Sequence, residues 1–137
     1  MIRTRLAICA ALIAGVAAGI SLDRTLLAQQ AGLTRTVLQR VDDPASAKHE
    51  AVMVAVEIQP GANAGLHRHP GVEIGYVLDG TVIIEHAGRQ PATKKAGEHF
   101  QIDAAAAHDA KNAGATPAKI LAIYVVEKGK PLAEPVK

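Results

Sequence analysis

A chain of 137 residues has room for one domain and little more. Hydrophobic residues make up 49% of it, mostly Ala, Val, Ile and Leu, which is enough to close a single core. The net charge is only +2, and no basic patch with interleaved aromatic residues is present, which excludes the usual signature of a nucleic-acid-binding protein. Phe100, Tyr76 and Tyr124 are the only aromatic residues, so a pocket in this protein should have aliphatic walls.

The first 28 residues have the layout of a secretory signal peptide. Two arginines precede an uncharged stretch over residues 6–22, and small residues lead to Ala28, after which we expect cleavage. Cleavage near Ala18 is one alternative. An uncleaved membrane anchor is another, because residues 6–22 lie at the lower edge of the length that spans a bilayer. We therefore predict an exported protein, periplasmic or secreted, with no stable membrane association once the signal is removed.

The remainder of the chain is electrically neutral and free of cysteine. Residues 1–28 hold three of the 15 basic residues and one of the 13 acidic residues, so the rest carries 12 of each. Cys9, the only cysteine, lies inside the predicted signal. A mature domain over residues 29–131 would then contain neither a disulfide nor a reactive thiol.

Short apolar runs separated by turn residues indicate about nine strands and no helix after residue 33. Asp79-Gly80 is the strongest signal for a two-residue hairpin, with residues 81–86 as its returning strand. Residues 132–137 contain two prolines and are expected to form a flexible tail. The pattern predicts an all-β antiparallel sandwich or barrel. The expected strands cover residues 32–41, 50–58, 66–69, 72–78, 81–86, 91–95, 97–102, 107–112 and 119–126.

Three histidines and one glutamate form a candidate metal site. His67 and His69 are one residue apart, so on a strand both rings point to the same side. Glu73 follows the Pro70-Gly71 turn and is expected to face the two rings across a hairpin, while His108 would close the set from the far side of the barrel. Such a donor set suits Fe, Mn, Ni, Co, Cu or Zn better than Ca²⁺ or Mg²⁺, which prefer oxygen ligands.

The spacing around these residues resembles the two conserved motifs of the cupin family. The first motif is Gly61, five residues, His67-Arg68-His69, three residues, Glu73, six residues and Gly80; the second is Gly97-Glu98, then His108, three residues and Asn112. The resemblance implies a small jelly-roll barrel, also called a double-stranded β-helix. It also implies a metal ion bound inside by His67, His69, Glu73 and His108, with Fe or Mn favoured, and a homodimer.

The second motif departs from the family at Asp103, Ala105 and Ala107, where Pro, Gly and Pro are usual. If the family glycine serves a left-handed backbone, an alanine there costs about 1 kcal/mol. We therefore expect the loop over residues 103–107 to follow a different path.

Several polar residues near the motifs have plainer interpretations. We expect Arg68 to face away from the metal and Tyr76 to pack on the outer face. His99 is interpreted as a partly exposed strand histidine rather than a group that contacts substrate. His49 and His86 should be solvated. The side chain of Asn112, finally, is expected to hold the loop around His108 in place.

Three functions are compatible with such a site. The resemblance to the quercetin-dioxygenase-like branch of small cupins implies an oxidoreductase that acts on a small molecule, although few aromatic residues are available for a large flavonoid. A non-redox isomerase, decarboxylase or lyase is the second possibility, with His99 or Glu98 as proton carrier. A non-catalytic module that binds a ligand or a metal is the third.

Overall fold

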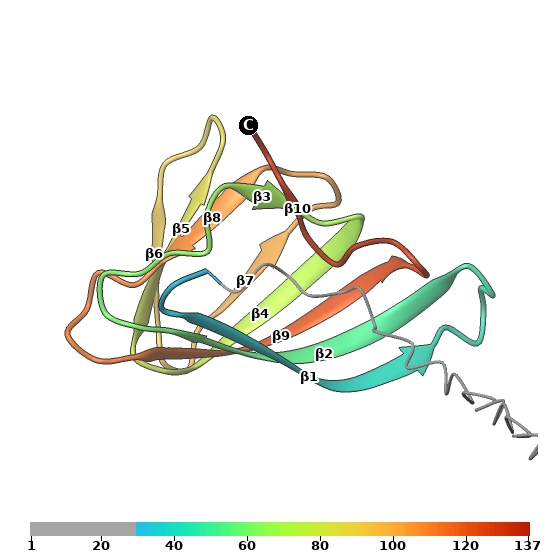
Figure 1. Ribbon diagram of the computed structural model, residues 1–137, viewed down its shortest axis with the longest axis horizontal. Coiled ribbons are helices and arrows are strands. Elements are labelled where there is room, and N and C mark those ends of the chain that lie inside the picture. Colours follow the sequence, from blue (N-terminus) through green and yellow to red (C-terminus); the bar gives the residue numbers. More distant parts are fainter. Residues whose placement is uncertain (1–29) are drawn as a thin grey trace, which may run out of the picture.

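The computed structural model describes residues 30–137, which form ten strands joined by turns (Figure 1). This part of the chain has no helix, as predicted, and hence none that could cross a membrane. The predicted signal peptide, residues 1–28, lies outside the described residues. The strands are β1 (Leu33–Asp42), β2 (His49–Ile58), β3 (His67–Arg68), β4 (Gly71–Asp79), β5 (Thr81–His86), β6 (Ala92–Lys95), β7 (His99–Ile102), β8 (His108–Lys111), β9 (Ala118–Glu127) and β10 (Glu134–Pro135).

Two five-stranded antiparallel sheets make up the barrel. The first sheet has the order β1-β2-β9-β4-β7, and the second sheet has the order β10-β3-β8-β5-β6. In Figure 1 the long strands of the first sheet run below the shorter strands of the second sheet. The predicted all-β class and the jelly-roll arrangement are confirmed.

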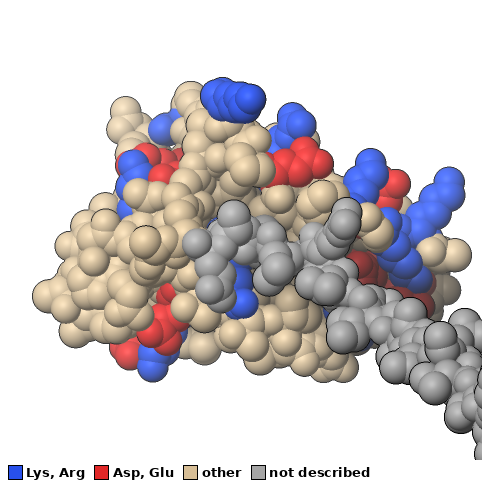
Figure 2. Space-filling model, viewed as in Figure 1, with Lys and Arg blue, Asp and Glu red and all other residues tan. Residues whose placement is uncertain are grey.

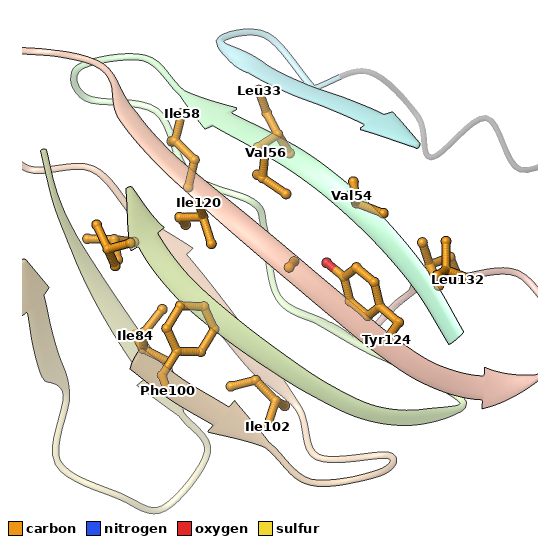
Figure 3. Packing of buried hydrophobic residues seen from close by; sticks show 14 of the residues in the cluster. Leu33, Val54, Val56, Ile58, Ile84, Phe100, Ile102, Ile120, Tyr124 and Leu132 are labelled. Carbon is orange, nitrogen blue, oxygen red and sulfur yellow. The ribbon is translucent and has the colours of Figure 1, made fainter. Parts of the chain in front are cut away.

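The core lies between the sheets and is built by strict alternation along β2 and β9. Val52, Val54, Val56 and Ile58 of β2 are buried, and their register partners on β9, which include Ile120, are buried as well. Figure 3 shows Val54, Val56, Ile58 and Ile120 in one packed cluster with Ile84 of the second sheet and with Phe100 and Ile102 of β7 in the first sheet. Burying an aliphatic side chain of this size stabilises the fold by about 1.5–3 kcal/mol, so the alternation of β2 and β9 contributes a large part of the stability.

The hairpin predicted at Asp79-Gly80 is wrong. β4 pairs with β9 and β7 in the first sheet, whereas β5 pairs with β8 and β6 in the second sheet. Gly80 has a positive φ of 76°, and a side chain there would meet the Pro117 carbonyl oxygen at 2.8 Å. The two turn residues therefore carry the chain from one sheet to the other.

The C-terminal segment, predicted to be a flexible tail, is instead part of the second sheet. Glu134 and Pro135 form β10 and pair with β3, and the Val136 amide donates to the Leu66 carbonyl. Leu132 is only 3% exposed. Burial of this apolar side chain, together with the free edge of β3, holds the segment against the barrel.

Charged side chains of both signs are mixed over the face of the molecule shown in Figure 2.

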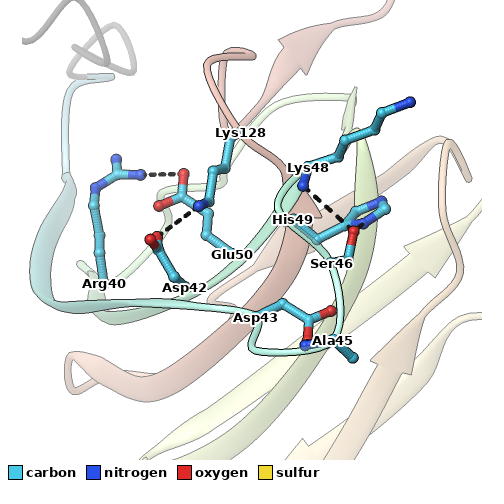
Figure 4. A network of polar contacts seen from close by, with 9 residues as sticks. All are labelled: Arg40, Asp42, Asp43, Ala45, Ser46, Lys48, His49, Glu50 and Lys128. Atoms are coloured by element: carbon cyan, nitrogen blue, oxygen red, sulfur yellow. Dashed lines mark hydrogen bonds and ion pairs between the residues drawn. The ribbon is translucent and has the colours of Figure 1, made fainter.

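A polar network stabilises the turn between β1 and β2 (Figure 4). In it, Arg40 pairs with Glu50 at 2.7 Å and Lys128 pairs with Asp42 at 2.8 Å. The ring of His49 is exposed and bonds to the Ser46 hydroxyl, in agreement with the solvated position that we predicted.

Candidate metal centre

Both sheets contribute residues to the candidate metal site of three histidines and Glu73. His67 on β3 and His108 on β8 are direct register partners in the second sheet, while Glu73 lies on β4 in the first sheet. The positions that we expected for Glu73 and His108 relative to the other two rings are therefore wrong. Glu73 reaches the rings across the barrel interior rather than across a hairpin, and His108 is the neighbour of His67 rather than a residue on the far side. The three imidazoles nevertheless lie together, Glu73 contacts those of His69 and His108, and all four side chains are buried.

Backbone carbonyl groups fix the orientation of all three imidazole rings. Each ring faces one carbonyl oxygen through its Nδ1 atom, and a carbonyl can only accept a hydrogen bond, so each Nδ1 must carry the proton. The Nε2 atom of each neutral ring is then a bare lone pair. The three bonds run from His67 to Gly65 at 2.6 Å, from His69 to Leu132 at 2.7 Å and from His108 to Ala106 at 3.0 Å.

These lone pairs converge on a common space together with a carboxylate. One ring nitrogen from each histidine lies within 4.8 Å of the others. Glu73 Oε2 is 2.9 Å from His69 Nε2 and 3.4 Å from His108 Nε2. His69 Nε2 is buried and has no hydrogen-bond partner among the described residues.

Two acceptor atoms this close repel each other unless a cation lies between them. A single proton would bridge only one nitrogen and one oxygen and leave the other nitrogens bare. One divalent transition-metal ion would satisfy all of them, so the residues fit such an ion.

The charges of the site also suit a metal. Burial alone would raise the pKa of Glu73, but the neighbouring imidazoles of His108 and His69 lower it to about 2. Burial, followed by the neighbouring His108 ring, lowers the pKa of His67 to about 4. At neutral pH the carboxylate is therefore ionised and His67 is neutral, which are the states in which both bind metal.

A cavity of about 20 Å³ adjoins the cluster. Half of its lining residues are aliphatic, in line with the prediction, but Arg35 and Tyr124 also line it, and sequence reasoning missed both. Tyr124 is 3% exposed and its ring packs against His69 at a centroid distance of 4.7 Å. Its pKa is raised well above 10, first by burial and then by the charge of Glu73. The alternation Ala122, Tyr124, Val126 already placed this tyrosine on the core face of its strand.

The loop before His108 corrects another prediction. Ala105 adopts a positive φ of 60°, so the loop takes the left-handed turn instead of avoiding it. The Ala105 amide donates to the His69 carbonyl at 3.0 Å, and the next carbonyl, that of Ala106, orients His108. Contacts with two of the candidate ligands thus offset the local strain.

The remaining polar residues divide into confirmed and corrected predictions. Arg68 faces outward to Glu134 at 3.1 Å, and Tyr76 is 46% exposed, as expected. His99 is exposed, which confirms its plain interpretation. Glu98 is exposed too, and neither residue lines the cavity, so the predicted proton carriers do not reach the site.

Two further residues differ in detail. His86 is half-buried rather than solvated, and its ring centroid lies 6.2 Å from that of His108. Asn112 is structural, as predicted, but it holds other segments: its amide donates to the carbonyls of Ile58 and Thr116, each at 2.8 Å.

Comparisons with known proteins agree with this architecture. A family model described as "Cupin domain" matches residues 54–124. No curated protein matches the chain. Among solved structures, a conserved protein with a double-stranded beta-helix domain from Klebsiella pneumoniae is 21% identical, with a TM-score of 0.62, over 79% of this chain and 87% of that one.

Two larger enzymes have the same fold over part of their length. An oxalate oxidase is 25% identical with a TM-score of 0.59, over 77% of this chain and 55% of its own. An oxalate decarboxylase is 22% identical with a TM-score of 0.60, over 72% of this chain and 27% of its own. The present chain therefore spans about half of the first enzyme and about a quarter of the second.

Proposed function

The chain belongs to the family of cupin domains, and on this premise we propose that it is a metal-dependent oxidoreductase of the dioxygenase-like type that acts on a small molecule. His67, His69, Glu73 and His108 would hold one divalent transition-metal ion. Fe or Mn is favoured, with Zn, Ni, Co and Cu as alternatives. When bound, the ion supplies redox or Lewis-acid chemistry that the side chains themselves lack.

One observation carries the proposal: three buried imidazoles turn proton-free nitrogens toward one another, and an ionised carboxylate contacts two of them. The backbone carbonyls that accept the Nδ1 protons fix the orientation of the three rings independently of a bound ion. Three nitrogens and one oxygen leave further positions free on an ion that takes six ligands, which is what a reactive centre needs. The likeness to oxalate oxidase supports the oxidoreductase class.

The residues around the ligands have separate roles in this proposal. Glu73 supplies one negative charge against the ion. Ile58, Ile84 and Ile120 give the cavity an apolar wall. The raised pKa of Tyr124 keeps its hydroxyl protonated beside the Glu73 carboxylate.

A non-redox isomerase, decarboxylase or lyase is the second candidate, and the position of Tyr124 favours it. Such chemistry needs a proton carrier near the metal, and a buried phenol that lines the cavity can donate one. Activity that persists without dioxygen, and with Zn²⁺ in the site, would select this candidate over the first.

Elemental analysis of the purified protein tests the proposal. We expect about one equivalent of metal in the wild type and a large loss in a His67→Ala variant. His99→Ala is the matched control, because His99 is an exposed histidine away from the cluster and its loss should leave the metal content unchanged. Equal metal content in the wild type and His67→Ala would remove the ligand assignment.

An oxygen-uptake screen of the metal-loaded protein then separates the two catalytic candidates. Metal without turnover of any substrate would leave the non-catalytic binding module. Export through residues 1–28 and assembly into a homodimer remain predictions; N-terminal sequencing of the mature protein should find a start after Ala28.

A further inference from the structure

Arg35 is the cavity residue that the metal-binding proposal does not use. It lies on β1 opposite Val56 in the register, and Val56 is buried in the core, so the Arg35 side chain also starts from the inner face of the first sheet. It lines the cavity together with His67, Glu73 and His108. A guanidinium group is thus directed into the space beside the candidate metal ligands.

This arginine has no ion-pair partner among residues 30–137. Each of the other arginines in that range has one: Arg40 pairs with Glu50, Arg68 with Glu134 and Arg89 with Asp103. Those three pairs lie toward solvent, where an arginine needs a partner least. Burial lowers the pKa of Arg35, because charge removed from water without a close partner is costly.

Glu73 forms no ion pair with Arg35, although its charge opposes the lowering of the Arg35 pKa. Its Oε2 atom is already engaged with His69 and His108 at 2.9 and 3.4 Å. With a divalent ion bound, the ion and Arg35 bring three positive charges and Glu73 brings one negative charge. The loaded site therefore has an excess of two positive charges in a partly buried space, which favours an anionic ligand.

The shape and the walls of the cavity narrow the choice of anion. A guanidinium is a planar fork that matches a carboxylate with two parallel hydrogen bonds. Val56, Ile58 and Ile120 offer aliphatic surface, and the small size of the cavity favours a short ligand over a long one. Phe100 and Tyr124 are the two aromatic residues among the residues that line the cavity, and the other apolar lining residues are aliphatic.

We propose that the substrate is a short aliphatic carboxylate with a second oxygen donor, held by its carboxylate on Arg35 while the second oxygen faces the metal centre. This inference rests on the proposed function, because the second contact requires the ion. Arg35 would then decide which substrates enter, while the histidines and Glu73 decide which metal is held.

Calorimetric titration of the metal-loaded protein with glycolate tests the inference, with glycolamide as the neutral ligand of the same size. Arg35→Gln should weaken glycolate binding at least about tenfold, since a hydrogen-bonded charge pair is lost. It should leave glycolamide binding and metal content unchanged. Arg35→Lys keeps the charge but loses the planar fork, so its glycolate affinity should lie between those of the wild type and Arg35→Gln. Arg40→Gln, on the same strand with its side chain in an exposed pair, is the matched control and should bind glycolate like the wild type.

The outcomes separate this inference from the proposed function. A wild type without metal would overturn both. A metal-loaded wild type that binds glycolate no better than glycolamide would overturn the inference alone. Equal glycolate affinity in the wild type and Arg35→Gln would also overturn the inference alone. Loss of metal from Arg35→Gln would overturn it too.

Discussion

Removing residues 132–137 should weaken both the fold and the metal centre. The truncation deletes the buried Leu132 side chain, worth about 2 kcal/mol by its apolar burial. It also deletes the carbonyl that accepts the His69 Nδ1 proton, and a buried donor left without a partner costs about 1–3 kcal/mol. We expect the free energy of unfolding to fall by roughly 3–5 kcal/mol, a large part of the stability of a small domain.

The truncation should also lower metal affinity by about 10- to 100-fold, because the bond that orients a ligating imidazole is lost. Leu132→Ala separates the two effects, since it keeps the carbonyl: it should cost about 2–5 kcal/mol of stability and retain the metal affinity. Glu134→Gln breaks only an exposed pair with Arg68 and should cost less than about 1 kcal/mol.

Urea unfolding and competitive metal titration measure these quantities. A truncated protein with wild-type stability and wild-type metal affinity would refute the reasoning. Equal metal affinities for the truncation and Leu132→Ala would show that the carbonyl does not orient His69.

Three more predictions follow from single contacts. Gly75→Ala should destabilise the fold by about 1–3 kcal/mol, measured by thermal unfolding, because the new methyl group would lie 2.1 Å from the Phe100 ring; an unchanged melting temperature would contradict this contact. Ala105→Gly should raise the free energy of unfolding by up to about 1 kcal/mol, since it relieves the positive φ of 60°; a loss of stability would show that the turn is unstrained. In the metal-free protein, stability should fall as the pH drops from 6.5 toward about 4, because the folded state lowers the pKa of His67 and the unfolded chain takes up the proton first. The loss of stability that comes from His67 is on the order of 3 kcal/mol. Stability falls further from pH 4.5 toward about 2 as Glu73 is protonated. Urea unfolding at a series of pH values measures it, and constant stability down to pH 4.5 would contradict the shift.

Local sequence patterns were enough to place the strands and the candidate ligands. Alternation along β2 and β9 marked the core face, and the motif spacing of His67, His69, Glu73 and His108 identified the cluster. These signals work because the side chains of a strand point to opposite faces in turn, whatever the strand pairs with.

The same patterns contain no information about which strands become neighbours. Asp79-Gly80 has the residues of a hairpin, yet it joins two sheets, because β4 pairs with β9 and β7 while β5 pairs with β8 and β6. Arg35 lies on the inner face of its strand by alternation, but only the closed barrel brings it to the candidate metal ligands that follow in the chain.

The sequence by itself determined the all-β class, the approximate strand positions and the four residues that meet at the site. Tertiary structure alone decided that β10 covers β3, that the Leu132 carbonyl orients His69 and that Arg35 and Tyr124 enter the cavity. The physical reason is that burial and hydrogen bonding between distant segments choose the strand partners, whereas periodicity along one strand reports only which side faces inward.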